Sequence, residues 1–235
     1  MTVPCLSDVE LTGSKGPFLG AWQQTNGGGG SSAKTTLWEA GHRQVGIAAW
    51  PGVIKPGTVS PALASTLDYF PTLAALAKVP LPADRVYDGV DLSAVLRGQA
   101  ATAAGRTALF HPNSGASGLI GYLDGVRMDT PDGHQFKAIY ETGGAAGCGE
   151  GNRAAPLRHD PPLLFDLSVD PAEAHPLDRA SHGPVLAEIK RIRAAKLKNV
   201  LETFHSVANY EQGPAGPGGP SPCCNPKNVN CRCTD

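Results

Sequence analysis

The hydrophobic period changes in the second half of the chain, and this change limits the folds open to it. The period shifts toward two, and four segments with turn residues between them are candidates for strands. A long helix is expected after them, because apolar residues recur every three or four positions over 184–206. The pattern predicts a small antiparallel sheet covered by a helix. The expected strands are 107–111, 120–128, 135–141 and 163–167.

The first hundred residues predict an α/β unit with many loops, in keeping with 29 glycines and 21 prolines in 235 residues. A short apolar run at 45–50 ends at Pro51 and is expected to be a buried strand followed by a turn. Helical spacing runs over 58–78, but Pro71 interrupts it. We therefore expect a short helix or a loop, followed by a second helix with Pro71 in its first turn.

Two local signals refine this order of elements. Asp91 or Ser93 is expected to cap a short helix that runs through Arg97. Asp132-Gly133 separates the second and third expected strands, and Asp-Gly is a common hairpin turn. The expected organisation is a partial α/β domain at 1–100, a small α+β domain at 101–212, and a Pro/Gly linker with a cysteine-rich tail at 213–235.

Composition excludes several classes of protein. The 20 Lys and Arg residues are balanced by 21 Asp and Glu residues, so a net charge of −1 argues against nucleic-acid binding. An apolar fraction of 41% supports a core and argues against general disorder. No apolar run approaches the roughly 18 residues that a membrane span needs, so none is expected.

A glycine-rich stretch comes close to a phosphate-binding loop. Residues 28–35 follow the pattern G-x-x-x-x-G-K-[ST], but Ala33 replaces the glycine that lets the backbone wrap a phosphate. The flanking residues make a poor strand and a poor helix opening, although the motif needs both. A surface loop is the favoured interpretation, and nucleotide binding is the alternative.

The cysteines are concentrated at the C-terminal end. Four of the six fall in the last 13 residues, which is typical of an oxidising compartment. Their spacing, Cys-Cys-x6-Cys-x-Cys, does not pair ligands as structural zinc sites do, so disulfides are favoured over a zinc cluster. Three connectivities remain open. The four residues are Cys223, Cys224, Cys231 and Cys233.

Five segments, read in order along the chain, resemble the type I sulfatases, and the resemblance extends from about residue 10 to residue 233. It implies an α/β protein, the C-terminal portion of an alkaline-phosphatase-like sulfatase fold, with a small antiparallel-sheet C-terminal domain and its covering helix. It also implies hydrolysis of a sulfate ester, carried by a small molecule or a glycan. The segments are KTTLWEAGHR (34–43), AWPG (49–52), LDYFPTL (67–73), DGVDL (88–92) and PLLFDL (162–167).

The family's nucleophile is a formylglycine made from the cysteine of a Cys-x-Pro-Ser-Arg motif, and this motif is absent from the sequence. The resemblance implies calcium in the complete enzyme, but the paired aspartates and the Asp-Asn-Gly-Pro motif that bind it are also absent, so no metal ligand is assigned. The N-terminus does not resemble a signal peptide. We expect a C-terminal fragment that is inactive alone and poorly soluble, because its sheet is incomplete. A genuine non-catalytic module of the secretory pathway is the alternative.

The resemblance assigns few site residues. Lys34 matches the family's active-site lysine, which contacts the sulfate group, and an ammonium in a dry site stabilises a developing oxyanion. His111 and Asn113 follow an expected strand and are candidates for substrate contact, although loop residues of these types more often form turns. The two remaining cysteines, Cys5 and Cys148, are expected to form a disulfide with each other. A lysosomal or extracellular location follows from the cysteines and the family, and no oligomeric state is assigned.

Two charged patterns have local interpretations. Glu39 and Arg43 lie four residues apart and predict an ion pair that fixes a turn. The long helix carries five cations, which suggest an anionic partner, but acidic residues interrupt them and a solvated helix face is favoured. The five are Lys190, Arg191, Arg193, Lys196 and Lys198.

Overall fold

A computed structural model gives the fold of the chain and describes residues 16–26, 32, 36–101, 106–112, 123–144 and 155–203. Residues 201–203 are described by their backbone only. The chain forms two compact units, residues 1–200 and 201–235. The described residues belong to the first unit, apart from residues 201–203 at the end of its last helix. The domain boundaries expected at residues 100 and 212 stay predictions.

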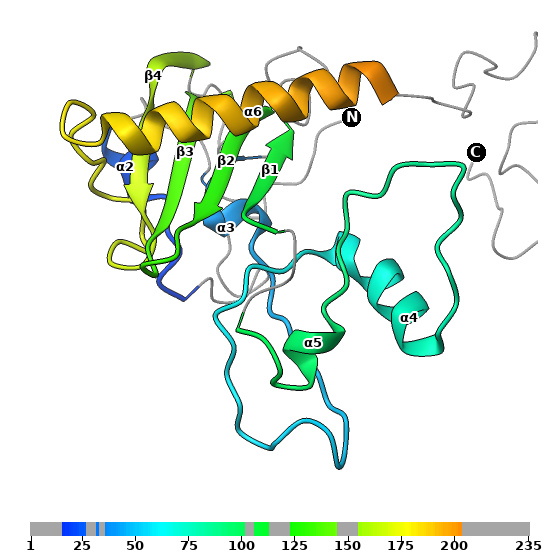
Figure 1. The fold of residues 1–235 in the computed structure, drawn as a ribbon. Coiled ribbons are helices and arrows are strands. Elements are labelled where there is room, and N and C mark those ends of the chain that lie inside the picture. The colour runs from blue at the N-terminus through cyan, green and yellow to red at the C-terminus, as the bar shows by residue number, and fades with distance from the viewer. Residues whose placement is uncertain are drawn as a thin grey trace, which may run out of the picture. The chain divides into compact units, whose positions relative to one another are not determined.

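A four-stranded antiparallel sheet is the centre of the fold (Figure 1), and its strands follow one another in the order β1-β2-β3-β4. All four expected strands are confirmed, three of them within about three residues at each end. The fourth begins six residues earlier than expected. The strands are β1 (Ala108–Pro112), β2 (Leu123–Asp129), β3 (Gln135–Thr142) and β4 (Leu157–Asp166).

The expected hairpin turn joins β2 to β3. Thr130 and His134 close it through the bond from Thr130 N to His134 O, 3.0 Å long, and Gly133 lies inside it with a φ of 92°. This backbone conformation is disfavoured for residues with a Cβ, so the Asp-Gly signal identified the turn for a physical reason. The turn sets the register in which Val126 faces Ala138, and Ala138 in turn faces Leu164.

One face of the sheet is covered by α6 (Gly183–Thr203), the long helix expected from the apolar spacing. In Figure 1 this helix crosses the strands. Ile189 is completely buried against the strand residues that point to this side, and Leu186 and Ile192 flank it. These strand residues alternate in sequence, as the period of two requires. They are Val126, Met128, Phe136, Ala138 and Leu164.

The opposite face is covered by segments from the beginning of the chain, which the sequence pattern did not predict. Two short helices, α2 (Ala21–Asn26) and α3 (Glu39–His42), belong to these segments. Trp38, just before α3, is 2% exposed and meets Phe165 edge to face at 5.8 Å. Trp22 of α2 packs beside Trp38 at 6.2 Å. The sheet is therefore buried on both sides, which explains why β2, β3 and the second half of β4 hold no exposed residues.

Residues 58–78 form a loop and then a helix, as the position of Pro71 indicated. A 3₁₀ turn, η1 (Thr66–Asp68), leads into α4 (Tyr69–Ala77), where Pro71 is the third residue. Asp68 is completely buried and accepts hydrogen bonds from Ser65 N and Val90 N, and it pairs with Arg106. The short helix α5 (Ser93–Leu96) follows, and Asp91 accepts from Ser93 N at its start.

The prediction of a buried strand at 45–50 is wrong. This segment forms no strand, and Val45 and Ile47 are 86% and 89% exposed. A buried strand needs neighbouring strands for its backbone hydrogen bonds, and none of the described strands lies beside this one. Further exposed apolar side chains follow it along the chain. They include Val59, Leu67, Phe70, Leu73, Val79 and Val86.

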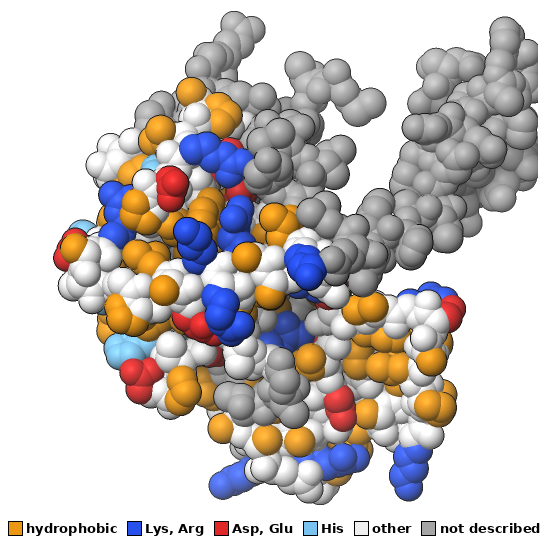
Figure 2. All heavy atoms as spheres, turned by 45° about the horizontal axis from the view of Figure 1, so that its top comes forward, with side chains coloured by type: hydrophobic (Ala, Val, Ile, Leu, Met, Phe, Trp, Pro, Cys, Tyr) orange, Lys and Arg blue, Asp and Glu red, His pale blue; other side chains and the backbone are white. Residues whose placement is uncertain are grey.

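Basic side chains gather over α6 (Figure 2), and most of them have local partners. Arg191 forms two bonds of 2.7 Å with Glu188, and Lys196 pairs with Asp88. The guanidinium of Arg193 lies 4.1 Å from the centre of the Tyr140 ring. Within the described residues, no helix has both the length and the apolar character that a bilayer crossing demands.

Candidate functional site

The structure describes one of the three residues expected to contact substrate. His111 lies on β1, whereas Lys34 and Asn113 lie outside the described residues. All six cysteines also lie outside them, so the disulfide predictions stay predictions. The site is therefore built from the described residues on both sides of Lys34.

A turn after β4 holds the start of both short N-terminal helices. Ala21 N and Trp22 N donate to the carbonyl oxygens of Ala172 and Glu173, at 2.9 and 3.0 Å. The carboxylate of Glu173 accepts from Glu39 N at 2.8 Å. Lys34 lies in the connection between the two helices. One buried glutamate therefore anchors the helix on each side of the connection that carries this lysine.

Glu173 adopts an unusual conformation to make these contacts. Its φ is 53°, which is rare for a residue with a side chain, and its side chain is completely buried. Asp170 shapes the turn, because its carboxylate accepts from Ala174 N and His175 N. Backbone strain of this kind persists where the surrounding contacts over-determine it.

Two further bonds lie close to Lys34 in sequence. Ser32 Oγ donates to Leu19 O at 2.6 Å, and Thr36 Oγ1 donates to Ser32 O at 3.0 Å. Gly20 makes this packing possible, since a Cβ there would lie 2.7 Å from Ser32 Cβ and 2.8 Å from Trp38 Cγ. Ser32 and Thr36, the described residues nearest to Lys34 in sequence, are thus tied to each other and to the residue that precedes Gly20.

A buried network of charges lies beneath these contacts. Lys137 of β3 is completely buried, and its Nζ lies 3.0 Å from Glu39 Oε1 and 2.7 Å from Glu173 Oε1. Arg127 of β2 adds a bond of 3.2 Å to Glu39 Oε2. The expected pair of Glu39 and Arg43 is confirmed at 3.3 Å, as one contact of this larger network.

The two carboxylates of the network differ in proton affinity. Burial alone would raise the pKa of Glu39, but the hydrogen bond to His42 and the charges of Lys137 and Arg127 hold it well below its usual range. Burial raises the pKa of Glu173, and Lys137 opposes this effect. The cations Lys137 and Arg127 balance Glu39 and Glu173 within the buried part of the network, which lowers the cost of burying these charges, and the fifth group, Arg43, is partly exposed.

His111 packs against the same network through His42 of α3. The centres of the two imidazole rings are 3.9 Å apart. Burial, with the nearby charges of His42 and Lys137, lowers the pKa of His111 to about 2, and burial lowers the pKa of His42. Nε2 of His111 is buried without a hydrogen-bond partner among the described residues. Both rings are therefore neutral near pH 7 and contribute packing rather than charge.

We expect stability to fall between pH 7 and pH 5 because of His111. The unfolded state takes up a proton near the ordinary pKa of 6.5, whereas folded His111 does not until about pH 2. Its stabilising contribution is present above about pH 6.5 and is lost as the pH falls, by roughly 2 kcal/mol at pH 5. Urea unfolding of His111→Phe should show a weaker pH dependence than the parent chain. The exposed His175→Gln is the control, and equal pH dependence in all three chains would contradict the assignment.

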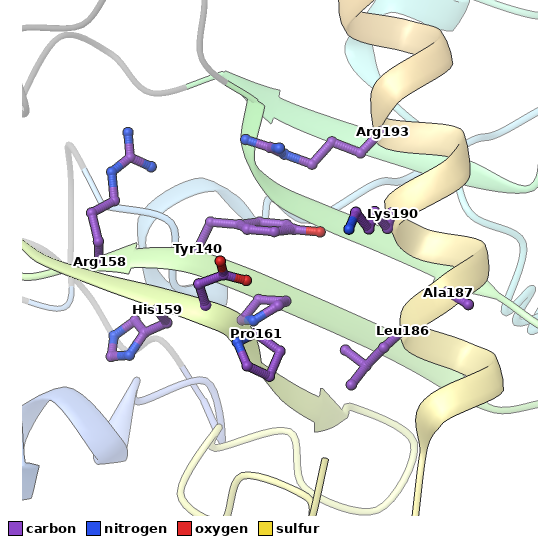
Figure 3. A pocket seen from close by; sticks show the side chains of 10 residues that line it. Tyr140, Arg158, His159, Pro161, Leu186, Ala187, Lys190 and Arg193 are labelled. Atoms are coloured by element: carbon purple, nitrogen blue, oxygen red, sulfur yellow. The ribbon is translucent and has the colours of Figure 1, made fainter. Parts of the chain in front are cut away.

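A cavity of about 450 Å³ lies elsewhere, between α6 and the strands β3 and β4 (Figure 3). None of the expected site residues lines it.

Sequence reasoning missed Lys137, Arg127 and Glu173. A signal for Lys137 was present, because it points to the same side of its strand as Ile139 while the other side of that strand is also apolar. A charged residue at such a position needs a buried partner. Glu173 gave no comparable signal, since its partners are about 36 and 134 residues away in sequence.

The comparison with protein families identifies the class. Residues 104–233 match the family model described as the C-terminal region of aryl-sulfatase, and the chain belongs to the sulfatase family. Arylsulfatase G is among the relatives that match this chain. The human protein is 45% identical over 232 residues, and the dog protein is 46% identical. Human steryl-sulfatase is 35% identical over 210 residues.

These matches cover nearly all of this chain but less than half of each relative. The alignment includes 98% of the chain and 42% of human arylsulfatase G, and 85% of the chain and 34% of human steryl-sulfatase. Among solved structures, the PsFucS1 sulfatase from Pseudoalteromonas shares the fold, with a TM-score of 0.60 and 22% identity over 74% of the chain and 33% of its own. A protein from a Bacteroides thetaiotaomicron locus for the metabolism of glycosaminoglycans has a TM-score of 0.52 and 28% identity, over 70% of this chain and 31% of that one.

Proposed function

We propose that this chain is the C-terminal part of an arylsulfatase that hydrolyses sulfate esters, and that Lys34 contacts the sulfate group. The family assignment supports the reaction class. The observation that carries the role of Lys34 is the turn around Glu173, which binds the first residues of both helices that flank the lysine. A cation between two anchored helices stabilises negative charge without reorganising during the reaction.

The chemistry also needs a nucleophile and calcium from residues other than those described. Calcium takes six to eight oxygen ligands, usually including several carboxylates. The described residues contain no group of three or more His, Cys, Asp or Glu side chains that fits a metal ion. The formylglycine motif is absent from the sequence. We therefore propose that this chain alone binds sulfate esters without hydrolysing them.

The exposed apolar side chains at 45–86 support a larger fold around this chain. Val45 and Ile47 lie outside any helix or strand and are exposed, although an apolar run of this kind is typical of a buried strand. Exposed apolar patches of this kind mark interaction surfaces or aggregation sites. We propose that this surface packs against the remaining α/β portion of an alkaline-phosphatase-like sulfatase fold, which corresponds to the part of arylsulfatase G outside the match. A non-catalytic secretory module is the alternative.

Complementation tests this function directly. The chain is co-expressed with the unmatched N-terminal part of human arylsulfatase G, in a secretory host that makes formylglycine, and hydrolysis of p-nitrophenyl sulfate is measured. We expect activity from the pair and none from either part alone. A stable complex without activity would favour the non-catalytic module, and absence of a complex would refute the proposed packing surface. Whether the co-expressed protein is found in lysosomes or in the medium would test the proposed lysosomal or extracellular location.

A further inference from the structure

The cavity between α6 and the sheet holds polar groups that the fold itself does not use. Its walls come from three elements that are far apart in sequence: β3, the start of β4, and the middle of α6. The cavity is about 450 Å³ in volume, within the range of small-molecule sites. It is lined by Tyr140, Arg158, His159, Asp160, Pro161, Pro162, Leu186, Ala187, Lys190 and Arg193.

Two of the lining cations are already neutralised. Arg158 lies 2.5 Å from Asp124 and 2.9 Å from Glu141. Arg193 lies 3.7 Å from the same Asp124 carboxylate, donates to Leu123 O and lies over the Tyr140 ring. These contacts satisfy both guanidinium groups and hold the wall of the cavity in place. They do not provide free charge for a ligand.

His159 is also occupied and contributes no charge to the cavity. Its Nε2 lies 2.8 Å from Thr142 Oγ1. Burial and the charge of Arg179 lower its pKa, so the ring is neutral near pH 7.

Three polar groups remain without a hydrogen bond or ion pair in the part of the chain that the structure describes. They are the ammonium of Lys190, the carboxylate of Asp160 and the hydroxyl of Tyr140. Figure 3 shows the Tyr140 hydroxyl directed toward Lys190 on the helix. The negative charge of Asp160 acts on Tyr140, which places the carboxylate near the same ring. A cation, an anion and a hydroxyl thus converge on one space without pairing with one another.

The rest of the wall is apolar and rigid. Pro161, Pro162, Leu186 and Ala187 provide it, and Arg179 fixes the proline segment by donating to Pro161 O at 2.6 Å. Apolar walls with a few convergent polar groups are the usual form of a small-molecule site. The free groups specify the ligand: an acid group for Lys190, and hydroxyl donors for Asp160.

We propose that this cavity is a second, non-catalytic binding site for an acidic monosaccharide unit, whose carboxylate or sulfate group pairs with Lys190 and whose ring hydroxyls bond Asp160 and Tyr140. The apolar wall packs against the carbon face of the ring. This inference goes beyond the proposed sulfatase activity, because the site is formed by residues of this chain alone. Its test needs no turnover.

Calorimetric or NMR titration of the full chain tests the site with four probes: glucuronate, glucose, inorganic sulfate and glycine. We expect glucuronate to bind with a Kd on the order of 1 mM, a value typical of a ligand this small. Glucose should bind about tenfold more weakly, since it lacks the charge-assisted bond to Lys190. Sulfate and glycine, which carry charge without the ring, should bind more weakly than glucuronate.

Two substitutions separate the parts of the site. Lys190→Gln should remove the preference for glucuronate over glucose, whereas Asp160→Asn should weaken both sugars. The control is Lys55→Gln, which removes an exposed lysine outside the cavity. Circular dichroism checks that each variant is folded, and Lys190 is exposed enough for its variant to fold.

Three results would overturn the proposal. Glucuronate binding that is absent at roughly 50 times the expected Kd would exclude the site. If sulfate or glycine bound as tightly as glucuronate, the site would recognise only the charge of a ligand and not the sugar ring. Glucuronate binding that Lys55→Gln weakens as much as Lys190→Gln would place the interaction on the general surface.

Discussion

Replacing Lys34 by Ala in the complemented enzyme should lower kcat/KM for an aryl sulfate by roughly 10²- to 10³-fold, the usual loss when one preorganised charge donor is removed from an active site. Lys34→Arg should restore only part of the activity, because a planar guanidinium does not occupy the position of a compact ammonium. The measurement is steady-state hydrolysis of p-nitrophenyl sulfate.

The matched control for Lys34 is Lys55→Ala, which removes an exposed lysine from a turn in the same half of the chain. It should leave kcat/KM unchanged. Activity of Lys34→Ala within about threefold of the parent would contradict the proposed contact with sulfate. Such a result would leave the family assignment intact, since that rests on the matches and not on this residue.

Replacing Lys137 by Met should destabilise the fold by about 3–5 kcal/mol. The substitution leaves the carboxylates of Glu39 and Glu173 facing each other in a buried space, with Arg127 as the nearest remaining cation in the network. The pKa of Glu173 is already raised by burial, so this group should take up a proton when the ammonium is lost. Urea unfolding at pH 7 measures the change.

A double variant separates charge from packing in this network. Lys137→Met with Glu173→Gln removes one charge of each sign and should recover part of the lost stability. Arg191→Ala is the control, because it breaks an exposed pair with Glu188 and should cost less than about 1 kcal/mol. Equal losses for Lys137→Met and Arg191→Ala would show that the buried pairs contribute little.

The sheet and its covering helix were predictable because local patterns determine them. A period near two indicated the four strands, Asp132-Gly133 indicated the hairpin, and apolar spacing indicated α6. The continuous apolar run at 45–50 was misleading, because the described chain provides no neighbouring strand there. A strand depends on its partners, so its sequence alone is not sufficient.

The candidate site was less predictable than the fold. The resemblance to sulfatases identified Lys34, which the structure leaves outside the described residues, and the placement of His111 beside His42 on α3 was not expected. The groups that anchor the flanking helices came from long-range contacts. Lys137 and Glu173 meet only because β3, β4 and the following turn bring them together. No local pattern contains that information.

The contacts of Glu173 also have a consequence for the order of folding. Trp22 and Glu39 leave the ribosome well before the residue that binds them, which lies about 134 residues beyond Glu39. Contacts so distant in sequence form late, because a long loop must be closed first. The N-terminal helices should therefore stay unattached during most of synthesis and dock last. A ribosome-bound chain that ends before residue 170 should remain open to proteases at 16–43, and one that extends past α6 should resist them.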